Sequence, residues 1–109
     1  MSPLKLSELN RIVQNVLSLH FTDTLWVVAE ISDCREAANG HCYMELVEKE
    51  EERSGGFTAK ARANVWRNVW QQVKYDFQRQ TGRSLATGLK ILAEVSVQFH
   101  EVYGYSLTI

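Results

Sequence analysis

Two short segments of this sequence carry aromatic, basic and amide side chains at every second position. A period of two is typical of β-strands, in which alternate side chains point to opposite faces. One face would therefore combine aromatic rings with cations. Rings can stack on bases and cations can bind phosphates, so the pattern is typical of single-strand nucleic-acid binding. The residues on that face are His41, Tyr43, Lys60, Arg62, Asn64 and Trp66, with Arg67 just beyond.

Each of these side chains also has an interpretation that needs no ligand. Tyr43 and Trp66 could pack against a flanking helix. Lys60 and Arg62 could simply be solvated. Both alternatives stay open on the sequence alone. Trp26 could also stack on a base, but a helical segment precedes it closely in the sequence, which favours packing against that helix.

The elements that would position these residues begin with a helix. Ser7 is suited to cap its N-terminus, and Glu8 in the first turn suits the helix dipole. One apolar stripe at helical spacing predicts that this helix packs, and it consists of Leu9, Ile12, Val13, Val16 and Leu17. A second helix is predicted around Trp70 and Phe77, two core residues, with Gly82 as its C-terminal stop.

Five segments read as strands. The first covers residues 25–32, and Asn39-Gly40 predicts a turn into the second, 41–48. The acidic segment 48–56 has the composition of a hairpin loop. The third strand shows the clearest alternation, with Ala59, Ala61, Ala63 and Val65 on its apolar side.

A fourth strand is predicted from Leu89 to His100, with Phe99 in the core, and a fifth follows over 106–109 after a turn at 103–105. His100 and Tyr103 lie near this last turn and are further candidate nucleic-acid contacts. Five strands with one helix in front and one between the third and fourth predict a mainly β fold. The expected architecture is a five-stranded Greek-key barrel of the OB type, occupying residues 1–109 as one domain.

This sequence offers no candidate residues for catalysis of bond cleavage. The histidines and cysteines lack a metal-ligand spacing, and the acidic run Glu48–Glu52 reads as a solvated loop. We therefore expect no metal, no cofactor and no catalysis from this chain. Its net charge is −1, but the cations concentrate between residues 57 and 83, which allows one basic face.

Location is also suggested by the composition. No run of about 18 apolar residues occurs, so no membrane span is expected. The N-terminus has no secretory signal, and two cysteines, Cys34 and Cys42, are too few for a disulfide framework. We expect reduced thiols in a cytoplasmic protein.

Residues 26–32 and 40–46 resemble the N-terminal domain of the exodeoxyribonuclease VII large subunit, which typically reads W-V-x-G-E-I-S and then S-G-H-x-Y-F-x-L-K-D. Segments 6–10, 88–92 and 103–107 match the family in the same order, so the resemblance covers the whole chain. The departures are Ala29 for Gly, Asn39 for Ser, Met44 for Phe, Val47-Glu48 for Lys-Asp, Trp66 for Phe, and a longer 48–56 loop.

The resemblance implies an OB domain that holds single-stranded DNA while an exodeoxyribonuclease degrades it to oligonucleotides. It also implies that the catalytic domain, and the helical region that binds small subunits, belong to a longer protein of which this chain is an N-terminal fragment. The alternative function is a protein-interaction domain, in which Tyr43, Trp66 and their neighbours contact another subunit.

Overall fold

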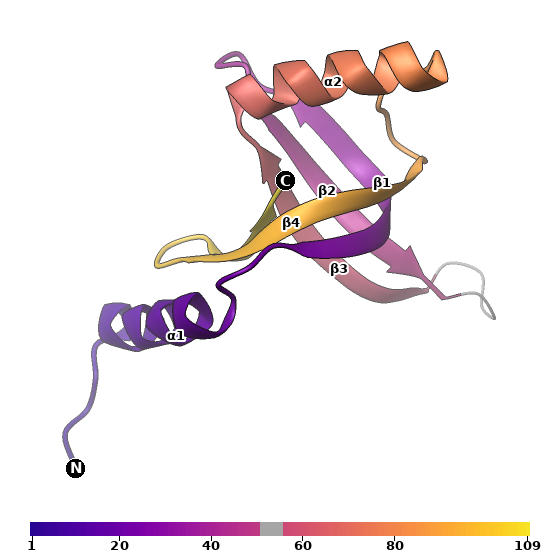
Figure 1. The fold of residues 1–109 in the computed structure, drawn as a ribbon. Helices are drawn as coiled ribbons and strands as arrows, with labels where there is room; N and C mark the ends of the chain where they lie inside the picture. The colour runs from indigo at the N-terminus through magenta and orange to yellow at the C-terminus, as the bar shows by residue number, and fades with distance from the viewer. Residues whose placement is uncertain (51–55) are drawn as a thin grey trace.

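Two helices and five strands make up the computed structural model, which describes residues 1–50 and 56–109 (Figure 1). In chain order they are α1 (Leu6–His20), β1 (Leu25–Glu36), β2 (Cys42–Lys49), β3 (Phe57–Val65), α2 (Arg67–Thr81), β4 (Lys90–His100) and β5 (Gly104–Thr108). The predicted order of helices and strands is confirmed. Most of the acidic loop predicted at 48–56 lies outside the described residues.

The strands form a closed barrel in the order β1-β2-β3-β5-β4, and β4 pairs back onto β1. Neighbours are antiparallel except β3 and β5, which run parallel and pair Ala63 with Leu107 and Asn64 with Thr108. Closure removes the unpaired strand edges that an open sheet of this size would expose. The predicted mainly β, five-stranded OB-type fold is confirmed.

β1 is longer than the sequence predicts, because it continues to Glu36 instead of ending at Ser32. Its pairing with β2 is irregular between Ile31 and Asp33. Such a bulge shifts the alternation by one residue and keeps the strand in the sheet. The four polar or small residues after Ser32 therefore belong to the barrel wall.

The turn between β4 and β5 also lies earlier than predicted, at residues 101–103 rather than 103–105. Gly104 is already the first residue of β5, with a φ of 79° that favours glycine. The predicted turn at Asn39-Gly40 is confirmed, and Gly40 has a φ of 90°.

The barrel interior follows the alternation predicted for β3. In the second half of the strand Ala63 and Val65 are buried and Arg62 is exposed, whereas Ala59, predicted on the apolar side, is exposed and Ala61 is half-buried. The inward row of β2 is buried as predicted. The core consists of Ala29, Ile31, Cys42, Met44, Leu46, Ala63, Val65, Trp70, Ala93, Val95 and Leu107. Phe99, predicted in the core, is half-buried near the end of β4 and lies outside this cluster.

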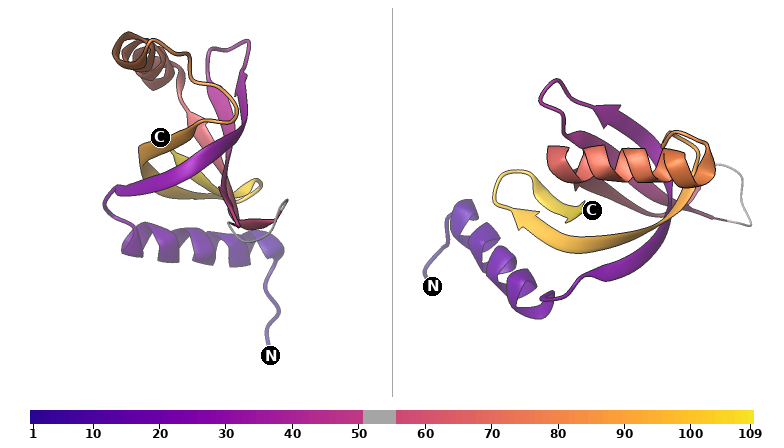
Figure 2. Two further views of the ribbon diagram at one scale, coloured as in Figure 1. Left: turned by 90° about the vertical axis from the view of Figure 1, so that its right-hand side faces the viewer. Right: turned by 45° about the horizontal axis from the view of Figure 1, so that its top comes forward.

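α2 lies across one end of the barrel, as both views in Figure 2 show. Trp70 is the one buried residue of α2, and Phe77 is half-buried. The Trp70 indole N–H donates to Glu36 Oε1 at 2.7 Å, and Lys74 Nζ reaches the same oxygen at 2.9 Å. Gly82 ends the helix in the left-handed conformation, as predicted. Glu36 thus attaches α2 to the last residue of β1.

α1 differs most from its prediction. It begins at Leu6, and the Glu8 carboxylate accepts a hydrogen bond from the Lys5 backbone N–H at 3.0 Å, so Ser7 is not its cap. None of its residues is buried. Leu9, Ile12 and Val16 of the stripe are about half exposed, whereas Val13 and Leu17 are half-buried. The stripe therefore predicted the helix correctly, and α1 lies against β4 with its stripe only partly buried.

The expected packing of Trp26 against α1 is also wrong. Trp26 is 66% exposed on the outer wall of β1. There it lies diagonally across from Leu92 of β4, which pairs with Val28. All three side chains are exposed. Together, Trp26, Val28 and Leu92 form an apolar patch on the β1–β4 wall.

The carboxylate of Glu36 makes the attachment of α2 dependent on pH. The hydrogen bond from Lys74, followed by that from Trp70, lowers the pKa of Glu36. A lowered pKa means that the stabilisation is complete above the ordinary glutamate value of about 4.3, and is lost as the pH falls through the lowered value. Glu36→Gln should lower the melting temperature at neutral pH and converge with the wild type in acid. Lys74→Met should also reduce this pH dependence, and parallel wild-type and Glu36→Gln curves would contradict the assignment.

Candidate nucleic-acid interface

The outward faces of β2 and β3 form one continuous surface. The ladder pairs Tyr43 with Asn64 and Glu45 with Arg62. Tyr43 is 36% exposed, and Arg62 is exposed beside it. Four of the predicted contacts thus lie on one wall of the barrel. We call Tyr43, Arg62, Asn64 and Trp66 the aromatic–basic face.

His41 and Trp66 extend this face by one step beyond the last ladder pair, Cys42 with Val65. Their rings meet edge to face, with centroids 5.1 Å apart and planes at 80°. His41 Nδ1 accepts a hydrogen bond from the Arg67 backbone N–H at 2.8 Å. The imidazole therefore satisfies the first N–H of α2 and holds Trp66 in place, while Trp66 keeps 44% of its surface exposed.

Gly40 explains how Arg67 fits against this corner. A Cβ at Gly40 would lie 2.6 Å from Arg67 Cδ, closer than real contacts allow. The Arg67 side chain runs past the turn at this glycine. Residues from the β1–β2 turn, the end of β3 and the start of α2 are therefore brought together, as the sequence predicted for His41, Trp66 and Arg67.

Arg62 connects the aromatic–basic face to the turn between β4 and β5. Its Nη2 donates to the backbone carbonyl of Tyr103 and lies 3.5 Å from that of Tyr105. The His100 ring stacks on that of Tyr103, with centroids 4.7 Å apart. His100 Nδ1 also accepts from the backbone N–H of Val102 at 3.0 Å. The structure thus places His100 and Tyr103, which we call the turn pair, beside Arg62.

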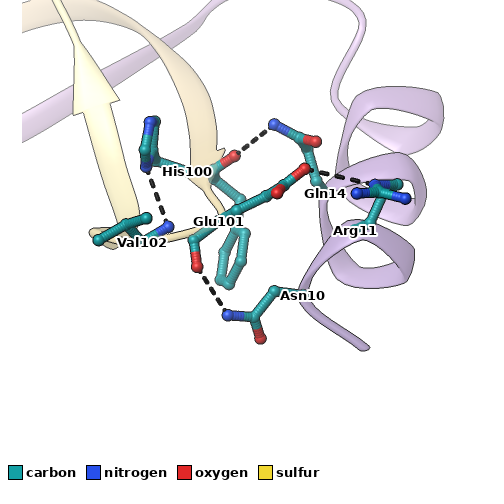
Figure 3. A network of polar contacts seen from close by, with 7 residues as sticks. Asn10, Arg11, Gln14, His100, Glu101 and Val102 are labelled. Carbon is teal, nitrogen blue, oxygen red and sulfur yellow. Dashed lines mark hydrogen bonds and ion pairs between the residues drawn. The ribbon is translucent and has the colours of Figure 1, made fainter. Parts of the chain in front are cut away.

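α1 also contacts this turn, as Figure 3 shows. Asn10 Nδ2 donates to the Glu101 carbonyl at 2.8 Å, and Gln14 Nε2 donates to the Phe99 carbonyl at 3.0 Å. Arg11 forms an exposed ion pair with Glu101 at 3.4 Å. The turn that carries the turn pair is therefore fixed between β3 and α1.

Lys60 lies apart from the other predicted contacts. Its ladder partner is Val47, and its Nζ lies 4.2 Å from the centroid of the Phe57 ring. It lies four positions before Asn64 along β3, which is about 13 Å in a strand. Lys60 thus extends the basic surface toward the far end of the β2–β3 hairpin, away from Tyr43 and Trp66.

Arg35 is a candidate contact that the sequence reasoning missed. It pairs with Tyr43 on the opposite side from Asn64, so the Tyr43 ring lies between a cation and an amide. Its side chain is 76% exposed and makes an ion pair with Asp33 at 3.1 Å. The sequence reasoning missed Arg35 because the predicted strand ended at Ser32. The bulge between Ile31 and Asp33 places Arg35 on the outer wall.

The face also carries negative charge. Glu45 lies between Asp33 and Arg62 in the paired strands, and its Oε1 accepts from the Ser32 hydroxyl at 2.8 Å. Within residues 1–50 and 56–109, no group of three histidine, cysteine or acidic side chains is placed to hold a metal ion. No described helix is both long and apolar enough to cross a membrane. Aromatic rings beside exposed cations suit binding of a flexible, negatively charged chain with planar groups.

Comparison with known proteins agrees with this geometry. The family model described as OB-fold nucleic acid binding domain matches residues 4–109. The exodeoxyribonuclease 7 large subunit of Deinococcus radiodurans is 34% identical over 97% of this chain. The corresponding subunit of Salinibacter ruber is 33% identical over 67% of the chain.

The matched region is a small part of each relative. This chain covers 26% of the Deinococcus protein and 16% of the Salinibacter protein. The likeness therefore concerns one domain of those subunits. The chain forms an OB-type barrel, and the family model matches it over nearly its full length. The chain therefore belongs to the family of OB-fold nucleic-acid-binding domains, and its relatives include exodeoxyribonuclease 7 large subunits.

Proposed function

We propose that this domain binds single-stranded DNA along the outer wall of β2 and β3. The observation that carries the proposal is the row across the barrel in which the exposed Tyr43 ring lies between Arg35 and Asn64. Bases would stack on Tyr43 and Trp66, while the guanidinium groups contact phosphates. Both kinds of group are needed, because every nucleotide offers one planar base and one charge.

The bound strand would run from the corner of His41, Trp66 and Arg67, past Tyr43, to the turn pair. Trp66 and Arg62 are four residues apart on one strand face, about 13 Å. Arg62 uses part of its guanidinium on the carbonyls of the turn. We therefore assign it two functions, positioning of the turn pair and charge for the phosphate backbone.

In the wider protein, we propose that the domain holds substrate for an exodeoxyribonuclease of the type named in its relatives. The relatives extend far beyond the matched segment. We place the hydrolytic step and the contacts with small subunits in such further regions, and the whole protein in the cytoplasm. The described side chains support binding rather than bond cleavage, because they supply rings, amides and cations.

Protein contact is a second candidate function, and a separate observation favours it. Trp26, Val28 and Leu92 expose a contiguous apolar patch on the β1–β4 wall. Exposed aromatic and aliphatic groups of this kind are enriched at the centres of protein interfaces. The residues proposed to bind DNA and the residues of this patch do not overlap, so the two functions are separable.

Single-stranded DNA should bind better than duplex of the same sequence. A duplex hides the base faces that Tyr43 and Trp66 would stack on, whereas its phosphates remain available. Fluorescence anisotropy at about 0.15 M salt should show a preference of at least roughly tenfold for the single strand. Equal affinities for single strand and duplex would mean that the aromatic–basic face binds DNA by charge alone, which would contradict base stacking.

Trp66→Ala should weaken oligonucleotide binding by about 1–3 kcal/mol, or roughly 5- to 150-fold in Kd. Trp26→Ala is the matched control, because it removes the same exposed side chain from the β1–β4 wall and should leave Kd unchanged. Thermal melts would first establish that both variants fold. The reverse result would place binding on the β1–β4 wall, and unchanged binding in both would leave only the turn pair.

Arg35→Ala should make the dependence of binding on salt shallower, because one phosphate contact is lost. The slope of log K against log salt should change by about 0.7 for a single strand. Arg83→Ala is the control, since this residue lies beyond the far end of α2, a helix of 15 residues or about 22 Å. The assignment of Arg35 fails if the two variants show the same slope.

A further inference from the structure

Two thiols lie close together inside the β1–β2 hairpin. The Sγ atoms of Cys34 and Cys42 are 3.5 Å apart. The ladder pairs Cys34 with Met44 and Cys42 with Glu36, so the cysteines are diagonal neighbours on the inward face. Neither takes part in the proposed DNA contacts. Both are free in this structure.

The two cysteines differ in their access to solvent. Cys34 is half-buried, whereas Cys42 is fully buried in the core. Burial, followed by the hydrogen bond with Cys34, raises the pKa of Cys42 to about 12. An oxidant from solvent therefore meets Cys34 first, because the thiolate is the reactive form and Cys42 offers little of it.

The turn between the two cysteines holds their strands in a fixed register. The intervening turn is closed by the hydrogen bonds from Ala37 N–H to the His41 carbonyl at 2.8 Å and from Gly40 N–H to the Ala37 carbonyl at 2.9 Å. A disulfide has a sulfur–sulfur distance of about 2.05 Å, so the sulfurs must approach by about 1.5 Å. Rotation of the two side chains toward each other, with adjustment of the hairpin backbone between them, would supply this movement.

We propose that Cys34 and Cys42 are a reversible disulfide site, oxidised by small-molecule disulfides such as glutathione disulfide. The Cys34 thiolate attacks one sulfur of the reagent, and one glutathione thiolate leaves. Cys42 then loses its proton to that thiolate and attacks Cys34 Sγ, releasing the second glutathione. The chain loses two protons and two electrons, and one glutathione disulfide takes them up to become two glutathione molecules. This site is independent of the proposed DNA binding.

Conversion of Cys34 to its mixed disulfide would itself favour the second step. The hydrogen bond and the charge of Cys34 are two of the causes that raise the pKa of Cys42. Both disappear once Cys34 Sγ is bonded to glutathione. Cys42 is then the adjacent nucleophile, and no larger movement of the barrel is needed.

The test is to incubate the chain with glutathione disulfide at 25 °C, after a thermal melt has established that it is folded there, and to quench free thiols with iodoacetamide. Intact mass should show a monomer that has lost two hydrogens and takes up no label. Trypsin cleaves after Arg35, which separates Cys34 in peptide 12–35 from Cys42 in peptide 36–49. The two peptides should be joined until a reductant is added, and the oxidised chain should melt roughly 5–10 °C higher.

Cys34→Ser is the control and tests the order of attack. It keeps a small polar side chain at a half-buried position and leaves only the buried thiol, so it should resist modification while folded. Disulfide-linked dimers, or a stable glutathione adduct without joined peptides, would overturn the proposal. Rapid modification of Cys42 in the Cys34→Ser variant would overturn the assignment of Cys34 as the first nucleophile.

Discussion

The parallel ladder between β3 and β5 is the contact through which the barrel closes. It pairs Ala63 with Leu107 and Asn64 with Thr108, and the Ile109 N–H donates to the Asn64 carbonyl at 3.0 Å. Without it, β5 would remain attached to β4 alone, and β3 would be an open edge. The same closure brings the β4–β5 turn to Arg62, because the guanidinium reaches carbonyls 41 and 43 residues away. The core and the candidate DNA surface therefore both depend on the short parallel ladder between β3 and β5.

Closure also explains how so small a chain divides its surface. The inward rows of the strands are used for the core, so binding groups must come from the outward rows and from the turns. Tyr43, Arg62 and Asn64 come from outward rows, and the turn pair comes from a turn. α2 and α1 lie at different parts of the barrel and leave the β2–β3 wall uncovered, as Figure 1 shows.

The sequence predicted the elements well where a regular period was sufficient. Ala63 and Val65 alternate with polar residues, and that alone assigns the two faces of β3. The sequence reasoning missed Arg35 because a bulge interrupts the period of two in β1, and no local sequence pattern predicts a bulge. The contact of Arg62 with the turn depends on closure of the barrel. The exposure of Trp26 and the partial exposure of the α1 stripe likewise depend on where distant elements lie. Periodicity along the sequence gives no information about those positions.

The attachment of α1 to the β4–β5 turn has a thermodynamic consequence. Asn10 and Gln14 bind carbonyls of the segment that carries His100 and Tyr103, so α1 and any ligand of the turn pair act on the same backbone. Linkage is reciprocal: if DNA orders that backbone, α1 is held more firmly by the same free energy that α1 contributes to binding. Under the proposed function, the N-terminal helix would then report occupancy of the turn pair through the shared backbone.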